Sequence, residues 1–405
     1  MTKSNDTGRA AMKFLDRDFL RGHIRSILDF YTPRVVDPTG GYFQNFRDDG
    51  TPFDPGRRHL VSSCRIVFNY CKAYELFGDA GHLQIARHGL RYLRDRHWDE
   101  ARAGYNWTLT DGHAADDRTN HCYGLAFVML CAAAAHEAGL DGALDELERA
   151  FQIMESRLWD ASNGIYADEA SPDWSSIDAY RGQNANMHSC EALILAYEAT
   201  GEARFLDRAC SLARKFTMDL PRKSDGLVWE HYTQDLEKDW EYNKDDPKNL
   251  YRPWGFQPGH QTEWSKLLLT LHDHRPEEWM IVRAQGLFDR ALEICWDKEN
   301  GGIFYGFAPD GTICDSDKYF WVQAESIAAS ARLFRKTSDP RYAKWYAAIW
   351  QYAWDHMIDH RYGGWYRILT ADNRKYSDEK STAGGKCDYH TIGACWDVLR
   401  NSNQV

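Results

Sequence analysis

The sequence predicts an all-α fold, an (α/α)6 barrel in which six helical hairpins close into a ring. Two observations lead to this prediction: a glycine closely followed by an aromatic residue recurs along the chain, and two stretches with helical apolar spacing lie between consecutive copies. The copies are separated by 63, 60, 62, 76 and 62 residues. Their glycines are Gly41, Gly104, Gly164, Gly226, Gly302 and Gly364.

Each copy is predicted to be a turn that leads into a short extended segment. Glycine favours the turn, and an acidic residue usually stands a few positions upstream of it. The upstream pairs are Trp98-Asp99, Trp159-Asp160, Trp296-Asp297 and Ile358-Asp359.

The stretches between the copies predict five helical hairpins, and single helices at the two ends of the chain predict a sixth. An open solenoid would need polar caps at both ends, whereas the two terminal helices would complete each other in a closed ring. In chain order the predicted helices cover residues 18–35, 59–77, 80–98, 120–139, 144–159, 183–200, 204–220, 260–274, 277–296, 318–337, 340–358 and 389–401.

The repeat runs through the whole chain, so we expect residues 1–405 to form a single domain. A length of 405 residues would ordinarily suggest two or three domains, but no linker rich in proline or serine interrupts the repeat. Residues 1–15 are expected to be a flexible N-terminus. The fourth repeat is longer by residues 234–254, which we interpret as a solvated insertion at the mouth of the barrel.

Composition excludes several classes of partner. A net charge of −11 disfavours binding to nucleic acid or to an anionic membrane surface. No apolar run approaches the ~20 residues of a membrane span, and the polar N-terminus lacks the core of a secretory signal. The ten cysteines are scattered without metal-site spacing, as expected for reduced core thiols in a cytoplasmic protein. The 16 tryptophans suit a large core; aromatic rings are also common around sugar-binding pockets, and a minority of these should line a site.

Aligning the repeats on their glycines brings polar residues to similar positions. These positions lie 23 to 26 residues after the glycine in four repeats, and 34 and 37 residues after it in the repeat with the insertion. Equivalent positions become neighbours around a ring, so the side chains should converge near the N-terminal turns of the inner helices. The aligned residues are Arg65, His188, Glu325, His390, His260 and Glu263.

Taken one at a time, these residues have structural explanations. A histidine at a helix start is more often a cap or a buried polar group than a catalyst, and a lone arginine or glutamate is more often an ion-pair partner. The shared register favours a common site. His121 fits the register poorly and is interpreted as a packing residue near the site. The three aligned histidines come from different repeats and Arg65 would repel a cation, so we expect neither a metal nor a cofactor.

Three runs of sequence resemble the N-acylglucosamine 2-epimerase superfamily. They are residues 186–192, residues 258–264 and Asp388-Tyr389-His390, together with Arg65 on the first inner helix. The resemblance covers essentially the whole chain and implies the (α/α)6 fold and an isomerase or epimerase acting on sugars. The Glu263-Trp264 pair is similar to the mannose isomerase branch.

The resemblance also implies roles for the aligned residues. His390 would move the proton between C2 and C1 of an open-chain sugar, and His260 would open the ring and act on the opposite face; the sequence leaves the two roles exchangeable. Arg65 would stabilise the enediolate, and Glu263 would orient His260 or hold a hydroxyl. The residues implied to bind substrate are His188, Glu263 and Glu325, with Trp321 and Trp396 as platforms for the sugar ring.

Several functions remain open on the sequence. An enediolate returns its proton to C1 in an aldose–ketose isomerase of the mannose–fructose type, and to C2 in a 2-epimerase of a free or N-acylated sugar. Glu263 and Glu325 would permit glycoside hydrolysis, to which the histidines are surplus. A noncatalytic sugar-binding module is a further alternative. In each case we expect a monosaccharide partner and a monomer or homodimer.

Overall fold

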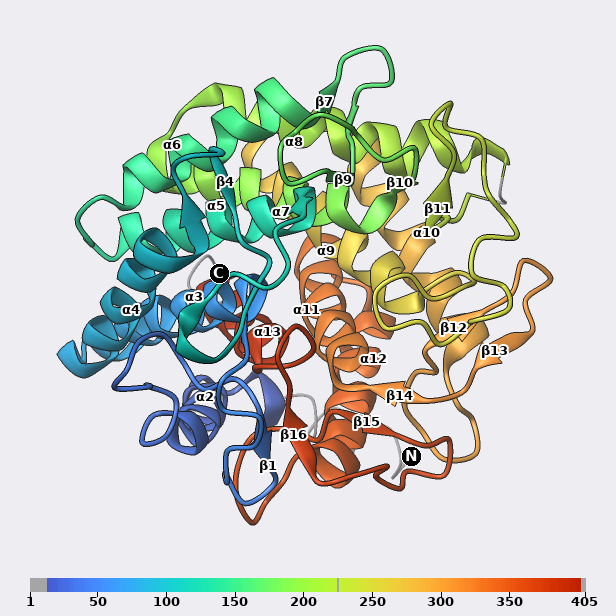
Figure 1. The fold of residues 1–405 in the computed structure, drawn as a ribbon. Coiled ribbons are helices and arrows are strands. Elements are labelled where there is room, and N and C mark those ends of the chain that lie inside the picture. Colours follow the sequence, from blue (N-terminus) through green and yellow to red (C-terminus); the bar gives the residue numbers. More distant parts are fainter. Residues whose placement is uncertain (1–12, 224–225, 402–405) are drawn as a thin grey trace.

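The structure is a computed structural model, and it describes residues 13–223 and 226–401. Over these residues, six helices form an inner ring and six others pack around it (Figure 1). The inner helices are α3 (Leu60–Phe77), α5 (Cys122–Glu137), α7 (Gln183–Thr200), α9 (Pro258–His274), α11 (Phe320–Thr337) and α13 (Tyr389–Asn401). The outer helices are α2 (Arg17–Tyr31), α4 (Ala80–Tyr92), α6 (Ala143–Ile153), α8 (Ala203–Arg214), α10 (Glu278–Cys295) and α12 (Pro340–Tyr352).

The burial of each ring follows from its sequence pattern. Inner helix α5 is apolar on all sides, and its residues from Leu125 to Ala135 are all buried. Outer helix α8 is amphipathic, so one face packs inward and the rest meets solvent. The core therefore lies between the two rings.

The ring closes as the repeat predicts. Each inner helix packs against the next, and α13 returns to α3 while also pairing with α2. The Arg17 guanidinium donates to the carbonyl of Leu399 at 3.0 Å, and the Tyr31 hydroxyl donates to Asp388 at 2.7 Å. The helix at the start of the chain is thus the outer partner of the helix at its end.

The ends of four outer helices differ from the prediction. We expected α-helix up to residues 98, 159, 220 and 358, but a five-residue π-helical turn ends each of these helices. Apolar periodicity cannot separate the two kinds of turn over five residues, because their side chains cover nearly the same face. The turns are Leu93–His97, Met154–Leu158, Lys215–Asp219 and Ala353–Met357.

The acidic residue of the repeat closes the predicted turn. In one hairpin, β3 (Trp98–Asp99) pairs antiparallel with β4 (Gly104–Tyr105), and in the next β7 (Trp159–Asp160) pairs with β8 (Ile165–Tyr166). The Asp160 carboxylate accepts backbone N–H bonds from Ser162 and Asn163 within that turn.

Short pairs of antiparallel strands line the mouth of the barrel and hold starts of the inner helices. Four of them join the two residues just before an inner helix to a neighbouring repeat: β2 (Arg58–His59) with β5 (Thr108–Leu109), β6 (Asn120–His121) with β9 (Glu169–Ala170), β10 (Arg181–Gly182) with β11 (His231–Tyr232), and β14 (Lys318–Tyr319) with β15 (Ile368–Leu369). The remaining pairs are β1 (Phe46–Arg47) with β16 (Glu379–Ser381) and β12 (Gly306–Phe307) with β13 (Ile313–Asp315).

The N-terminus and the insertion were singled out by the sequence. Of the segment predicted to be flexible, residues 1–12 lie outside the described residues, whereas residues 13–15 are helical and Phe14 is fully buried against Trp350. The insertion folds back on itself, since the Trp254 indole donates to the carbonyl of Trp240 and the Asn243 amide to that of Arg252.

Two further observations concern environment. None of the helices within the described ranges is long and apolar enough to cross a membrane. All ten cysteines are free, and all but Cys210 and Cys314 are buried.

Candidate functional site

A cavity of about 450 Å³ opens at the mouth of the barrel, above the N-terminal halves of the inner helices. Inner helices, mouth loops and the insertion all contribute to its wall. Six of the eight residues predicted for the site line it: Arg65, His188, His260, Glu263, Trp321 and His390.

The inner helices bring four of the predicted side chains to one depth. Arg65, His188, Glu263 and Glu325 each stand five residues after the first residue of their helix. Because the short strands hold four of the helix starts at the mouth, equal positions along the inner helices become equal depths in the barrel. This is the physical reason why residues 24 positions after separate glycines meet.

Each aligned histidine has a carboxylate at its Nδ1 atom. His390 contacts Glu325 at 2.7 Å, and His260 contacts Glu230 at 2.9 Å. A carboxylate accepts the Nδ1 proton and so leaves Nε2 as the bare nitrogen of the neutral ring. The third pair is His188 with Glu191, at 3.0 Å.

Burial keeps two of these rings neutral. Desolvation lowers the pKa of His188 to about 4, although Glu191 acts in the opposite direction. Desolvation also lowers the pKa of His390 and outweighs the contribution of Glu325. Near neutral pH both imidazoles are therefore proton acceptors.

His260 is held by a chain of hydrogen bonds that reaches into the core. The amide of Gln183 lies 2.8 Å from His260 Nδ1 and donates to the same Glu230 oxygen. The indole of Trp264, which is fully buried, donates in turn to the Gln183 carbonyl at 2.8 Å. Trp264 is thus a support behind the site and does not line the cavity.

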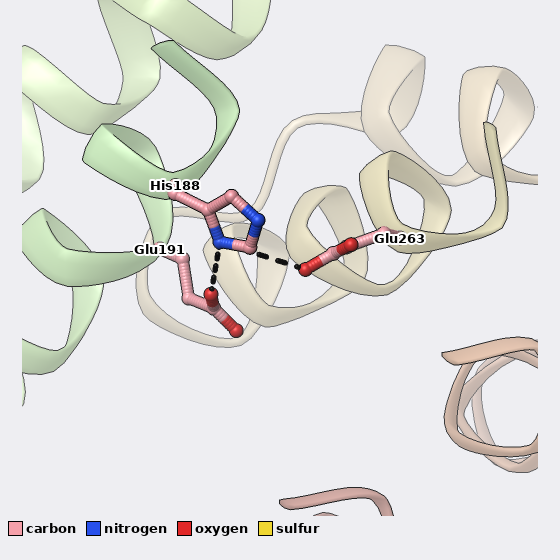
Figure 2. Close-up of side chains that lie close together, drawn as sticks. All are labelled: His188, Glu191 and Glu263. Carbon is pink, nitrogen blue, oxygen red and sulfur yellow. Dashed lines mark hydrogen bonds and ion pairs between the residues drawn. The ribbon is translucent and has the colours of Figure 1, made fainter. Parts of the chain in front are cut away.

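Three carboxylates and one lysine meet beneath the cavity floor. Figure 2 shows His188 and Glu191 of α7 pointing toward Glu263 of α9. The Lys266 ammonium lies 3.2 Å from Glu191, 3.9 Å from Glu263 and 2.6 Å from Glu325.

The lysine bears on whether this cluster could hold a metal. His188, Glu191 and Glu263 offer ligand atoms within 4.8 Å of one another, and so do Glu263, Glu325 and His390. A divalent cation there would meet the ammonium of Lys266 at close range, and like charges repel. The donor set therefore fits an internal ammonium better than a metal ion.

Glu263 differs from its neighbours. Burial, reinforced by repulsion from Glu325, raises its pKa well above the ordinary value. Neither of its oxygens has a hydrogen-bond partner within the described part of the chain. Its carboxyl group therefore faces the cavity with its hydrogen-bonding capacity unused.

Arg65 lies in an aromatic cage. Its guanidinium stands 4.4 Å from the ring centroid of Phe127 and 5.2 Å from that of Tyr389, and it donates to the Tyr123 hydroxyl at 2.9 Å. The side chain is only 5% exposed, so a buried positive fork is presented to the cavity.

Two residues predicted to bind substrate lie behind the main cavity. Glu325 lies behind His390 and does not line the cavity; it lines a second cavity of about 70 Å³ on the other side of the histidine. Trp396 also lines that second cavity, where its indole donates to Glu75. Trp321 does line the main cavity, and its ring centroid lies 4.9 Å from that of His260 and 5.8 Å from that of His390.

Glu263 does not orient His260, since Glu230 occupies that position. Neither Glu230 nor Gln183 follows the repeat register, so the alignment could not find them. Glu191 was detectable, because it stands three residues after His188 as Glu263 does after His260.

The insertion predicted at the mouth of the barrel forms part of the cavity wall, through residues that the sequence did not single out. The insertion contributes Tyr242, Leu250, Tyr251 and Arg252. His121, interpreted as a packing residue, lines the cavity with its ring centroid 4.0 Å from that of Trp107.

A buried carboxyl group, Asp168, completes this wall. Desolvation raises its pKa to about 7 against the opposing bond from the Gly182 amide. Tertiary packing alone creates this feature.

Comparison with known proteins identifies close relatives. Residues 41–394 match the family described as N-acylglucosamine 2-epimerase (GlcNAc 2-epimerase). The chain is 51% identical over 388 residues to a D-mannose isomerase from Marinomonas mediterranea, covering 96% of this chain and 98% of the relative. A crystal structure of D-mannose isomerase superposes with a TM-score of 0.94 at 50% identity, covering 96% of this chain and 99% of that chain. A cellobiose 2-epimerase from Bacteroides fragilis is 24% identical over 387 residues, covering 92% of this chain and 95% of the relative.

Proposed function

The chain belongs to the N-acylglucosamine 2-epimerase family, and from this premise we propose that it is an aldose–ketose isomerase that interconverts mannose and fructose. The 51% identity to a D-mannose isomerase extends over almost the whole of both chains. That similarity supports a monosaccharide substrate and an enediolate intermediate.

One observation supports the chemistry above all others. Two imidazoles, those of His390 and His260, line one cavity, and each has a carboxylate at Nδ1. Isomerisation needs a proton removed from C2 and returned to C1, and neutral imidazole suits both steps near neutral pH.

The proposed reaction begins with ring opening. Nε2 of His260 takes the proton of the anomeric hydroxyl and delivers it to the ring oxygen, which opens the ring. Nε2 of His390 then takes the proton from C2, and the electron pair moves into the enediolate. His390 returns the same proton to C1 while the hydroxyl proton on O2 passes to O1, which completes the ketose without net gain or loss of protons.

Arg65 and Trp321 complete the proposed site. The Arg65 guanidinium, held in its aromatic cage, stabilises the negative charge that develops on O1 and O2. Trp321 offers an indole face beside both histidines, on which the apolar face of a sugar can pack.

The enclosure of the cavity supports a monosaccharide rather than a larger sugar. Its volume of about 450 Å³ lies toward the lower end of the usual range of about 300–1,000 Å³ for small-molecule sites. Leu250 and Tyr251 of the insertion stand at its wall. We infer that the insertion limits the length of the sugar.

A 2-epimerase is the second candidate. Cellobiose 2-epimerases are related to this chain over more than nine-tenths of its length, and a second acid–base on the opposite face of C2 is what epimerisation requires. His260 could fill that role. Glycoside hydrolysis is disfavoured, because Glu325 does not line the cavity opposite Glu263.

Proton NMR of the purified protein with mannose in D2O tests the proposal. We expect fructose to appear, with an unchanged rate when EDTA is present. Glucose that appears first and carries deuterium at C2 would identify a 2-epimerase. Mannose that stays unchanged would contradict both candidates.

A further inference from the structure

A continuous belt of charged side chains connects two of the histidines through the floor of the cavity. It runs from His390 to Glu325 at 2.7 Å, to Lys266 at 2.6 Å, to Glu191 at 3.2 Å and to His188 at 3.0 Å. The two rings at its ends line the main cavity, whereas the three residues in its middle line the second cavity behind it.

We propose that Lys266 is a positioning residue that keeps Glu191 and Glu325 ionised and thereby holds His188 and His390 in the form with a proton on Nδ1 and none on Nε2. The inference rests on the proposed function for its effect on turnover. Its structural part concerns the protonation of two rings and stands without that function.

The charges explain why a cation is needed. Glu263 and Glu325 are buried and the Glu191 side chain is 15% exposed, and three carboxyl groups so close together cannot all ionise without a compensating charge. Lys266 touches all three, and its own side chain is only 12% exposed. It therefore supplies the compensating charge from the centre of the group.

Protonation of the belt would disable His390 as a base. The pair of Glu325 and His390 can gain one proton in two ways. In the first, the ring takes the proton and becomes an imidazolium. In the second, the carboxyl group of Glu325 takes it and donates to Nδ1, so that the proton of the ring lies on Nε2. In both states Nε2 carries a proton and cannot accept one from C2. Lys266 disfavours both states, because its ammonium repels the imidazolium in the first and loses its negative partner in the second.

Other charged and titratable groups surround the belt and contribute to the electrostatic potential at its residues. From α3 comes the guanidinium of Arg65, and from α9 the carboxyl group of Glu263. The groups on α7, α11 and α13 that line the second cavity or adjoin it are Glu198, Arg332, Tyr389, Asp397 and Arg400. Arg332 is paired with Asp397, and Arg400 with Glu198, whereas Lys266 is paired with Glu191 and Glu325.

The test compares K266M, which keeps the length of the side chain but removes its charge, with the charge-preserving K266R. In K266M we expect the acid limb of the pH profile of kcat/KM to shift to higher pH by at least about 1 pH unit. The reason is that an adjacent opposite charge lowers the pKa of a carboxyl group by about 1–3, and K266M removes that charge. The kcat/KM of K266R should stay within about threefold of that of the unsubstituted protein, and the acid limb of its pH profile should not shift.

K72M is the matched control. Lys72 is also a buried lysine of an inner helix with two carboxylate partners, Glu75 and Glu137, but it lies outside the main cavity. Its loss should lower the melting temperature and leave the pH profile unchanged. A purely structural role for Lys266 would make K266M behave like K72M.

Nitrogen NMR of the histidines gives a readout without substrate. In the unsubstituted protein at pH 7 we expect His188 and His390 to carry the proton on Nδ1 alone, and in K266M to gain a proton on Nε2. His260 is an internal control, because its carboxylate, Glu230, lies outside the belt.

The two readouts keep the hypotheses apart. Unchanged ring protonation and an unchanged acid limb in K266M would overturn the inference. A shift of ring protonation in a protein that does not isomerise mannose would support Lys266 and contradict the proposed function. If K266M does not fold, K266M/E191Q removes one carboxylate together with the cation, and the state of His390 decides the question in the same way.

Discussion

At the scale of the residue, the site consists of imidazoles whose chemistry is set by what lies behind them. His390, His260 and His188 each have a carboxylate at Nδ1. Burial lowers the pKa of His390 and His188, so these rings are neutral where an aldose would have to lose its C2 proton. In the proposed mechanism, proton transfer therefore depends on carboxylates that do not line the main cavity: Glu325, Glu230 and Glu191.

Replacement of the proposed base should abolish turnover. We expect H390A to lower kcat for the mannose–fructose reaction by at least about 100-fold, within the about 10²–10⁴ that positioned acid–base groups contribute. Sugar binding, measured by calorimetry, should largely survive. H274A is the matched control, since His274 also pairs with a glutamate, Glu198, but does not line the main cavity. A loss of only a few-fold in H390A would favour a noncatalytic binding module.

The carboxylate behind His260 should matter through the position of a proton. In E230Q the side-chain amide keeps its shape but can donate to His260 Nδ1, which moves the ring proton to Nε2. We expect kcat to fall by about 10- to 100-fold with KM nearly unchanged. E241Q changes an exposed glutamate of the insertion and should have no effect. Equal kinetics for E230Q and E241Q would show that Glu230 has no part in the reaction.

At the scale of the element, short strands and loops decide how the inner helices are used. The strands before α3, α5, α7 and α11 pair with neighbouring repeats and hold four helix starts around the mouth. The insertion then covers part of that mouth through Arg252, whose guanidinium pairs with Glu169, lies 4.0 Å from the ring centroid of Tyr180 and donates to Tyr242.

Release of the insertion should change substrate choice. We expect R252A to raise KM for mannose by about tenfold, because the wall over the cavity loses its attachment, and to raise the rate on cellobiose relative to mannose. Steady-state kinetics on both sugars measure this ratio. K244A removes an exposed ion pair within the same insertion and should leave both values unchanged. Efficient turnover of cellobiose by the unsubstituted protein would contradict a size limit set by the insertion.

At the scale of the whole molecule, closure of the ring buries titratable groups far from the site. Burial lowers the pKa of His23 and of His97 to about 4, as it does for His188. The Trp365 indole donates to Nε2 of His23, so that nitrogen is bare in the folded protein.

The lowered pKa values of these histidines predict that the free energy of unfolding falls in acid. Between pH 6.5 and pH 4 the unfolded chain binds protons that the folded chain does not, so stability is complete above about pH 6.5 and falls as the pH drops through that window. Each proton that only the unfolded chain binds contributes about 1.4 kcal/mol per pH unit to the slope of the unfolding free energy against pH. In H23Q, whose amide oxygen can still accept from Trp365, we expect the slope of the unfolding free energy to fall by up to that amount. Urea titrations at pH 7, 6, 5 and 4 measure the slope, and an unchanged slope would contradict the pKa of His23.

Much of the fold could be predicted from the sequence because it is written in a repeat. Gln183–Thr200 begins and ends where the pattern predicts, the last helix begins at Tyr389 as predicted, and the terminal helices α2 and α13 pair. The π-helical turns were missed because apolar spacing does not distinguish them. The structure places six predicted residues around one cavity, and three of them, Arg65, His188 and Glu263, stand at the same step of equivalent helices, which becomes the same depth in the barrel.

What the sequence determined by itself was the periodic part: helices, ring closure and the depth at which Arg65, His188 and Glu263 stand. What only the tertiary structure decided was the environment of each side chain. Glu230 reaches His260, Lys266 joins Glu325 to Glu191, and Trp396 lies behind the site. The physical reason is that a repeat is encoded locally along the chain, whereas these contacts depend on distances across the ring that exist only once it has closed.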